Sequence, residues 1–323
     1  MRVCVTGCCG FIGSNLTRTL LEQGREVVGI DKVFDPKRLP FYDGCEVHHD
    51  NINKITRKFE FIWLDLNELS QYGYIFDDID IVYHLAAYTP IRDEEIHKNI
   101  HDTVDATFTL LDLIVNHNVP KLVFSSTSSI YGEQPKRPLK ENEAPIKPIS
   151  HYAAGKIANE AYIQSYAFKH GFKAWMFRFA NVTGAGQNRG VIYDLLSKLK
   201  DNPDELLVLG NGKQIKSFFD VEDCVKGLID IPLTDKNNNV ELYNLGNTMT
   251  ITIGELAKIV SDEAGLFPKI KYSGGDRGWI GDTPHTIIDI SKVLETGWKP
   301  NYTCEQAIRR TVRWLLENEI SLS

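Results

Sequence analysis

Short, almost wholly apolar segments alternate with amphipathic ones through the first 180 residues, and this alternation limits the possible folds more than any other feature. Each apolar segment has the length of a buried strand, and each amphipathic segment has the period of a helix. Such alternation is typical of an α/β protein with a doubly wound parallel sheet covered by helices on both faces. We expect strands at 2–6, 26–30, 60–64, 79–85, 121–125 and 174–179, and helices at 12–23, 97–117 and 150–170.

After residue 181 the alternation becomes less regular, which indicates a smaller C-terminal α/β region. We expect residues 1–180 to form a Rossmann-type domain, with residues 216–247 packing back on it. Residues 181–215 and 248–323 should then form a second region. Thr303 and Gln306 have the spacing of a capping box, so the last helix should begin there.

Composition and charge exclude several other classes of protein. The formal net charge of -7 over 323 residues gives no cationic surface for nucleic acid. No run of eighteen apolar residues is present, and the first residues do not have the pattern of a signal peptide. The six cysteines are too scattered for a disulfide framework, and no Cys/His spacing predicts a metal site. We therefore expect a reduced, cytoplasmic protein without a metal, nucleic-acid or membrane partner.

Three glycines join the first expected strand to the first expected helix. Gly7, Gly10 and Gly13 allow a tight turn, a close approach to a pyrophosphate and close packing of the helix on the sheet. Asp31 follows the second strand, where a carboxylate binds adenosine ribose hydroxyls and repels a 2′-phosphate. This pattern predicts a dinucleotide site that prefers NAD to NADP. Lys32 is the one neighbour that argues the other way, because a cation there could meet a phosphate.

Tyr152 and Lys156 lie four residues apart in an expected helix, and therefore on one face of it. An ammonium beside a phenol favours the phenolate, which makes the tyrosine a usable base near neutral pH. The preceding strand ends in a run of hydroxyl residues at 125–129, at the sheet edge where ligands bind in such folds. We expect one of these hydroxyls to complete a catalytic triad with the tyrosine and the lysine.

Together these residues resemble the extended short-chain dehydrogenase/reductase family, in its nucleotide-sugar epimerase/dehydratase branch. The match is nearest to the UDP-galactose 4-epimerase-like members and runs through nearly the whole chain. Besides the residues already named, it rests on motifs that begin at Asp65, His84, Arg178, Gly190, Gly210, Arg277 and Gly297.

The resemblance implies roles for individual residues. Tyr152 acts as base and acid on the sugar 4-hydroxyl, Lys156 tunes it and binds nicotinamide ribose, and Thr127 shares the substrate hydrogen bond. The residues implied in binding NAD are Gly7, Gly10, Phe11, Ile12, Gly13, Asp31, Lys32, Asp65, Leu66, Leu85, Ala86, Ala87, Ser125, Tyr152 and Lys156. Those implied in binding a nucleotide sugar, most simply a UDP-sugar, are Thr127, Ser128, Tyr152, Asn181, Gly190, Val191, Lys216 and Arg277.

The two residues after Thr127 bear on the choice of reaction. In the family, 4,6-dehydratases have an Asp-Glu pair there, and UDP-glucuronate decarboxylases usually have a Glu at the second position. Ser128 and Ser129 cannot act as carboxylate bases, so we expect 4-epimerisation of a UDP-hexose, in its plain, N-acetylated or uronic form. A 4,6- or 5,6-eliminating dehydratase or a decarboxylase is the alternative, and a non-catalytic NAD-sensing protein is a more distant one.

Two further expectations come from the resemblance. The family usually has an asparagine where Thr103 stands, so the hydrogen bond made by that asparagine is an open question here. Members of the family also pair two helices with their copies in a homodimer, and the segments at 97–117 and 150–170 would do so here. The apolar residues expected on those helix faces are Val104, Phe108, Leu111 and Ile114, and Ala158, Tyr162 and Tyr166.

Overall fold

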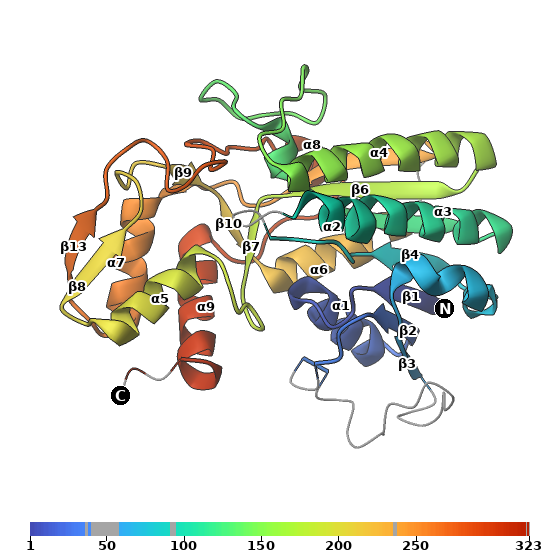
Figure 1. Ribbon diagram of the computed structural model, residues 1–323, viewed down its shortest axis with the longest axis horizontal. Helices are drawn as coiled ribbons and strands as arrows, with labels where there is room; N and C mark the ends of the chain where they lie inside the picture. The colour runs from blue at the N-terminus through green and yellow to red at the C-terminus, as the bar shows by residue number, and fades with distance from the viewer. Residues whose placement is uncertain (36–37, 40–57, 91–94, 235–237, 321, 323) are drawn as a thin grey trace. The chain divides into compact units, whose positions relative to one another are not determined.

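The computed structural model describes residues 1–35, 38–39, 58–90, 95–234, 238–320 and 322 of the chain (Figure 1). A seven-stranded sheet has the strand order β11-β6-β5-β4-β1-β2-β3, and β1 pairs in parallel with both β2 and β4. This order is that of a doubly wound sheet, so the predicted fold class is confirmed. The strands are β1 (Arg2–Thr6), β2 (Glu26–Asp31), β3 (Phe59–Trp63), β4 (Ile81–His84), β5 (Lys121–Thr127), β6 (Lys173–Phe179) and β11 (Val240–Leu245).

Helical segments connect these strands. The helix expected at 97–117 is divided into three parts, because a π-helical turn, η2, interrupts the α-helical hydrogen bonding. In Figure 1, α3 and α4 lie side by side. The segments are α1 (Phe11–Glu22), the 3₁₀ segment η1 (Leu66–Phe76), α2 (Ile96–Asn99), η2 (Ile100–Asp105), α3 (Ala106–Asn116), the 3₁₀ turn η3 (Ser128–Tyr131) and α4 (His151–His170).

The chain divides into two compact units. Unit 1 comprises Met1–Ser126, His151–Phe177 and Pro232–Leu242, and unit 2 comprises Thr127–Ser150, Arg178–Ile231 and Tyr243–Ser323. These bounds differ from the expected domains in three places. Residues 127–150 and 178–180 lie in unit 2, and of the segment 216–247 only 232–242 lies in unit 1.

The assignment of residues 127–150 to unit 2 has a plain physical reason. The buried Tyr131 hydroxyl donates to Asn244 Oδ1 at 2.7 Å and accepts from Arg178 at 3.0 Å. Arg178 also donates to the carbonyl of Glu141, and the Glu141 carboxylate accepts from the backbone of Asn244. These bonds join three stretches that are distant in the sequence, and no apolar pattern would have revealed them.

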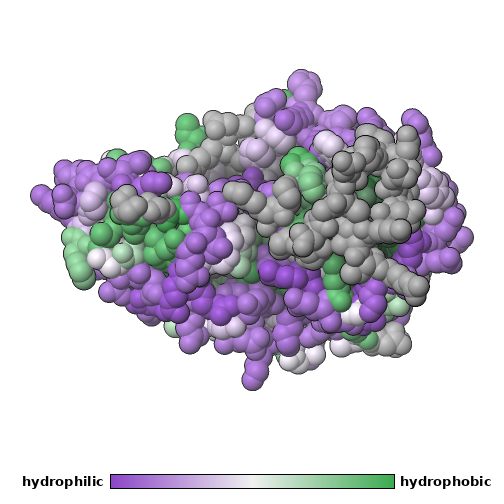
Figure 2. Space-filling model, turned by 90° about the horizontal axis from the view of Figure 1, so that it is seen from below, coloured by the Kyte–Doolittle hydropathy of each residue, from purple (hydrophilic) through white to green (hydrophobic). Residues whose placement is uncertain are grey.

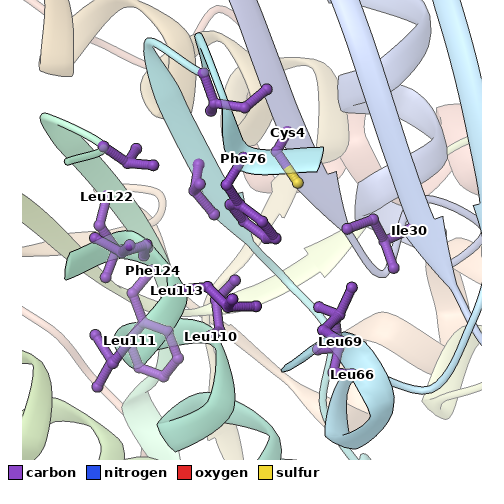
Figure 3. Close-up of a cluster of buried hydrophobic side chains, with 14 of the residues drawn as sticks. Cys4, Ile30, Leu66, Leu69, Phe76, Leu110, Leu111, Leu113, Leu122 and Phe124 are labelled. Carbon is purple, nitrogen blue, oxygen red and sulfur yellow. The ribbon is translucent and has the colours of Figure 1, made fainter. Parts of the chain in front are cut away.

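A hydrophobic core fills unit 1 between the sheet, η1, α3 and α4 (Figure 3). In β1, Cys4 belongs to this core, whereas its neighbours Val3 and Val5 are buried on the opposite face of the sheet, as the alternation of a strand requires. Burial of each large apolar side chain contributes about 1.5–3 kcal/mol. The core includes Ile30, Leu66, Leu69, Phe76, Leu110, Leu111, Leu113, Leu122 and Phe124.

Unit 2 has a core of its own, packed mainly between α5, α7 and α9. Thr303 and Gln306 form the predicted capping box at the start of α9, and Thr252 and Glu255 form another at α7. The elements are β7 (Asn181–Thr183), α5 (Val191–Asp201), β8 (Glu205–Val208), β9 (Ile215–Lys216), β10 (Phe218–Asp220), α6 (Val221–Asp230), the 3₁₀ turn η4 (Ile231–Leu233), β12 (Ile251–Thr252), α7 (Ile253–Glu263), β13 (Lys269–Tyr272), α8 (Ser291–Leu294) and α9 (Cys304–Asn318).

The surface is mostly polar. On the face shown in Figure 2, hydrophilic residues predominate, and hydrophobic ones gather at the end where Figure 1 places β8, β13 and α5. Exposed Leu207, Phe267 and Tyr272 belong to that end of unit 2. Within the described residues, no helix has both the length and the apolar character that a membrane span needs.

Candidate active site

The glycine loop of unit 1 is packed so tightly that side chains are excluded from it. Gly7 has φ +73°, and a Cβ there would lie 2.7 Å from the backbone nitrogen of Ala86. A Cβ on Gly13 would lie 2.0 Å from the carbonyl oxygen of Gly7. Gly10 caps α1 without a side-chain hydrogen bond, so the N–H groups of the first turn stay available to an anion. This cradle fits the pyrophosphate of a dinucleotide.

Asp31, the last residue of β2, is fixed beside this loop. Its Oδ2 accepts from the backbone N–H of Cys9 at 2.9 Å, and its Oδ1 accepts from that of Val33 at 3.0 Å. Burial raises the pKa of the Asp31 carboxyl, and these two hydrogen bonds oppose that rise. The carboxylate is only partly buried, so one side of it faces solvent where a ribose would bind.

Lys32 directly follows Asp31 in the sequence and is ion-paired with two other carboxylates, those of Asp65 and Asp102. Lys32 Nζ is 2.7 Å from Asp102 Oδ2 and 3.3 Å from Asp65 Oδ2. The side chain of Leu66 is buried in the core of unit 1, so a contact with adenine would come from its backbone. The groove residues Leu85, Ala86 and Ala87 follow β4 directly and are partly exposed.

Lys156 is fully enclosed on α4, and its ammonium is held by neutral groups. Nζ donates to the carbonyl of Ser125 at 2.7 Å and lies 4.7 Å from the centroid of the Phe124 ring. Burial lowers the pKa of this lysine to about 7, and the negative charge of Glu160 opposes the decrease. Tyr152 lies one turn earlier on the same helix and is partly exposed.

His84 connects the cofactor loop to the helices behind it. Its Nδ1 lies 2.8 Å from Thr6 Oγ1, and its Nε2 lies 2.9 Å from Thr107 Oγ1. Because the Thr107 hydroxyl donates to the carbonyl of Thr103 at 2.6 Å, it must accept from His84, which places the imidazole hydrogen on Nε2. Burial lowers the pKa of His84 to about 3, so the ring is neutral. The sequence offered the histidine only as part of a groove motif and gave no signal for Thr107.

Thr103 stands where the family usually has an asparagine, and it makes hydrogen bonds through both its hydroxyl and its carbonyl. Its hydroxyl accepts a hydrogen bond from the backbone N–H of Tyr88 at 3.0 Å. Its carbonyl accepts from Thr107 and from Asn159 Nδ2, the latter at 3.0 Å. The threonine therefore ties η2 to the chain that leaves β4, and it provides an acceptor at this position.

Thr127, the last residue of β5, opens unit 2. Its hydroxyl accepts from the backbone N–H of Ser129 and donates to Ser129 Oγ, both at 3.1 Å. Ser128 is buried in the turn η3. Ser125, in unit 1, donates from its own hydroxyl to the carbonyl of His84 at 3.1 Å. Ser126 donates to Glu160 Oε1, so the hydroxyls of Ser125, Ser126, Thr127 and Ser129 are all hydrogen-bonded at this strand end.

The predicted substrate residues of unit 2 are placed as follows. Asn181 Nδ2, at the start of β7, donates to the carbonyl of Ser217 at 3.0 Å. Gly190, with φ +97°, is the N-cap of α5, and Val191 is the first residue of that helix. A backbone with positive φ next to a helix N-terminus can approach an anion closely, which is the arrangement expected for a phosphate-bearing ligand.

Arg277 lines a pocket of about 360 Å³ in unit 2, and Lys216 is not among the residues that line it. Lys216 Nζ is bound to Asp282 Oδ1 at 2.8 Å and to the carbonyl of Thr283, so its charge is already paired within the unit. Arg277 forms an ion pair with Glu133 at 2.7 Å. The pocket is lined by Glu133, Gln134, Asn211, Lys213, Asp276, Arg277, Thr283, Pro284 and His285.

The helix faces expected to pair two copies need one correction. Leu111 and Ile114 are buried in the core of unit 1, because this stripe of α3 faces the sheet, and they are not available to a partner. The outward pair is Phe108 and Tyr162, whose ring centroids lie 4.2 Å apart, with Tyr162 exposed. Tyr166 contacts the same Phe108 ring edge to face.

A doubly wound sheet with a glycine cradle, an acidic β2 end and a Tyr-x-x-x-Lys helix defines a class of dinucleotide-dependent enzymes. The family model described as the NAD dependent epimerase/dehydratase family matches residues 3–246, and the chain belongs to this family. The predicted family, enzyme class and NAD cofactor are thereby confirmed.

Three similar proteins illustrate the match. A UDP-glucuronate 4-epimerase of Thermodesulfobacterium geofontis is 30% identical over 97% of this chain and 96% of its own. A crystal structure of a UDP-galactose 4-epimerase has a TM-score of 0.83 at 30% identity, with 99% of this chain and 100% of that chain covered. A UDP-glucuronic acid 4-epimerase from Bacillus cereus, solved with UDP-glucuronic acid and NAD, has a TM-score of 0.85 at 25% identity, covering 98% and 99%.

Proposed function

We propose that the protein is an NAD-dependent nucleotide-sugar 4-epimerase that acts on a UDP-hexose, in its plain, N-acetylated or uronic form. The observation that carries the proposal is the buried Lys156 of α4, one helical turn from Tyr152, whose ammonium donates to the carbonyl of Ser125 in β5. Serines at positions 128 and 129, where dehydratases have carboxylates, add to it. The 4-epimerases among the similar proteins support the same reaction.

The residues of unit 1 fit the cofactor. The Gly7–Gly13 turn and the first turn of α1 would hold the pyrophosphate, Asp31 the adenosine ribose, and Lys156 the nicotinamide ribose. When bound, NAD takes a hydride from C4 of the sugar and returns it to the opposite face. The chain's own task is to hold both ligands and to move the proton of the 4-hydroxyl.

Proton transfer falls to Tyr152. Its phenol would accept the proton of the sugar 4-hydroxyl and return it after the sugar has rotated in the site. The Lys156 ammonium favours the phenolate electrostatically, and its lowered pKa of about 7 places its own titration near neutral pH. Thr127 would share the hydrogen bond to the same oxygen. Its present bond to Ser129 is with a flexible hydroxyl partner that can exchange.

An elimination reaction requires groups that remove a C5 proton and protonate a leaving hydroxyl. Ser128 and Ser129 occupy the positions after Thr127, and an unactivated serine hydroxyl does not act as a base at neutral pH. The account therefore favours return of the hydride without loss of water or carbon dioxide.

The nucleotide sugar would be held by residues of unit 2. We assign Asn181, Gly190 and Val191 to the sugar and diphosphate and Arg277 to the diphosphate, which requires Arg277 to exchange its partner Glu133 for phosphate oxygens. Lys216, Ser128 and Thr127 complete the assigned set. We retain residues 1–180, with 216–247, as the NAD-binding domain, and 181–215 with 248–323 as the substrate-binding region.

The proposed setting of the enzyme is a homodimer in the cytoplasm. The outward Phe108–Tyr162 pair, with partly exposed Val104, Ala158 and Tyr166, offers an apolar face for a second copy. Sedimentation that gives a monomer mass at micromolar concentration would contradict the dimer.

The test is incubation of the purified protein and NAD with a panel of UDP-hexoses, followed by NMR and mass spectrometry. We expect one sugar pair to interconvert with no change of mass. Loss of one water would indicate a dehydratase, and loss of carbon dioxide a decarboxylase. A protein that binds NAD and converts none of the panel would contradict the proposal and favour an NAD-sensing role.

A further inference from the structure

The sequence contains a contradiction at the adenosine end of the cofactor site. Asp31 should repel the 2′-phosphate of NADP, whereas the next residue, Lys32, offers the cation that commonly binds that phosphate. The position of the Lys32 ammonium decides which residue dominates. The Lys32 side chain is 42% exposed, and its ammonium is ion-paired with two carboxylates from other elements.

The first carboxylate is Asp102 in the π-helical turn η2. Its Oδ2 lies 2.7 Å from Lys32 Nζ, and its Oδ1 lies 2.9 Å from His101 Nδ1. The Asp102 side chain is only 7% exposed, so burial holds its carboxylate in place independently of Lys32. Asp102 and Thr103 are the buried residues of this turn, and Thr103 anchors it through the backbone of Tyr88. The π-helical turn thus presents a rigid carboxylate to Lys32.

The second carboxylate is Asp65 at the N-cap of η1. Its Oδ1 accepts two hydrogen bonds from Asn67, one from the backbone and one from the side chain, both at 3.0 Å. Its Oδ2 is therefore left for Lys32, at 3.3 Å. The backbone of Lys32 is fixed as well, because its carbonyl accepts from the indole of Trp63 at 3.0 Å. Both ends of the lysine are thus held.

We infer that Asp102, with Asp65, determines the preference for NAD by holding the Lys32 ammonium and cancelling its charge, so that Asp31 alone meets the 2′ position of the adenosine ribose. The inference rests on the proposed NAD site. Three carboxylates, those of Asp31, Asp65 and Asp102, accompany the Lys32 ammonium, and His101 pairs with Asp102 as well. Even with His101 protonated, the cluster keeps an excess of negative charge that repels a phosphate.

The test is calorimetric titration of NAD and NADP into the purified full chain and four variants: Asp102→Asn, Lys32→Ala, Asp102→Asn with Lys32→Ala, and Asp105→Asn. Asp102→Asn keeps the size of the side chain but releases the lysine. Asp105→Asn removes the same charge from an exposed position of the same turn and is the matched control. Asp65→Asn is a second release variant, in case Asp102→Asn unfolds the turn, which a thermal melt would show.

Asp102→Asn should tighten NADP binding by about three- to fivefold, the size of one exposed ion pair, and leave NAD binding within about twofold. Lys32→Ala should not tighten NADP binding, and in the Asp102→Asn background it should abolish the gain for NADP. Asp105→Asn should have no such effect.

Three results would overturn the inference. One is unchanged NADP affinity in both release variants, another is a gain that survives removal of Lys32, and the third is an equal gain in Asp105→Asn. An unmodified protein that binds neither dinucleotide would instead refute the proposed function, and this inference with it.

Discussion

Lys32 and Lys156 belong to the same unit and face the same proposed cofactor, but their surroundings are opposite. Lys32 is partly exposed and paired with two carboxylates, and although partial burial acts against it, the bonds to Asp102 and Asp65 raise its pKa. Lys156 is buried against a carbonyl and an aromatic ring, and burial lowers its pKa to about 7. The carboxylates around Lys32 cancel its charge, whereas the surroundings of Lys156 place its titration near neutral pH, where it can assist proton transfer.

The comparison shows why residue type alone does not assign function. A lysine beside a nucleotide site suggests phosphate binding, but its partners decide whether the charge is available. Around Lys156 the enclosing groups are almost all neutral, and even the nearest histidine, His84, is held neutral by burial. The charged exception is Glu160, whose carboxylate acts on the Lys156 ammonium and opposes the effect of burial on its pKa.

The largest expected effect comes from removing each ammonium in turn. Lys156→Met should lower turnover by about 10³-fold or more and weaken NAD binding, because the phenolate of Tyr152 loses its stabilising charge. Lys32→Met, the matched control, should keep turnover within about threefold at saturating NAD. Steady-state kinetics with calorimetric NAD titration would measure both. Comparable losses of turnover in the two variants would mean that the contrast between the lysines is mistaken.

Removing the proton acceptor should separate chemistry from binding. Tyr152→Phe should lower turnover by about 10²–10⁴-fold, because the proton of the sugar 4-hydroxyl has no acceptor. Its affinity for NAD should stay within about twofold, because the Lys156 ammonium remains. Thr127→Ala should cost less than this, because Ser128 lies next to it. If Tyr152→Phe retains most of its activity, another base carries the reaction.

The next effect concerns the adenosine end of the cofactor site, where the affinities for NAD and NADP should differ by about one order of magnitude. NAD should bind at least about tenfold more tightly than NADP, a difference of about 1.4 kcal/mol. Asp31→Ala should narrow this gap, because it removes the carboxylate that repels the 2′-phosphate. Fluorescence titration of both dinucleotides would measure it. Equal affinities in the unmodified protein would show that a cation dominates the site after all.

The last expected effect is on the free energy of unfolding, which removal of Lys156 should raise and removal of Lys32 should lower. Between pH 7 and the ordinary pKa of lysine, the unfolded chain binds a proton that buried Lys156 does not, so the unfolding free energy rises with pH in that window. Without NAD, Lys156→Met should therefore be more stable than the original chain at pH 7, by about 1–4 kcal/mol. The difference should shrink towards pH 10.

The control is again Lys32→Met. Because the folded-state pKa of Lys32 is raised, its contribution is fully present below the ordinary pKa of lysine and is lost only above it. The stability difference caused by this variant should therefore stay constant between pH 7 and 10. Urea titrations at several pH values would show both trends, and parallel curves for the two lysines would argue against the buried, weakly basic Lys156.

Much of the fold was predictable because it depends on local patterns. The strands around β1 are continuous apolar runs, and the capping box of Thr303 and Gln306 is visible in four residues of sequence. The π-helical turn η2 was not predictable, because its hydrogen bonds span five residues instead of four and a single such turn leaves the apolar pattern almost unchanged. The same limit hid the Lys32–Asp102 pair, whose partners are distant in the chain.

The residues of the site were predicted unevenly for a similar reason. The spacing of Gly7, Gly13 and Asp31 is typical of one kind of loop and could be read from the sequence. His84 and Thr107 instead form a hydrogen bond between residues distant in the chain, which no sequence pattern indicates. The burial of Leu66 and the pairing of Lys216 with Asp282 also depend on long-range packing. Sequence therefore identified the chemistry better than it identified the groups that hold the chemistry in place.

The central claim is that one sugar carbon is oxidised and then reduced again while the Tyr152–Lys156 pair moves the hydroxyl proton. The hydrogen on that carbon does not exchange with solvent. The most direct test is turnover of the UDP-sugar in D₂O with NAD only in catalytic amount, followed by NMR of the sugar carbons. The account predicts full interconversion of the two epimers, no net NADH, and no deuterium on carbon. Deuterium at C5, or release of one NADH per sugar converted, would contradict it.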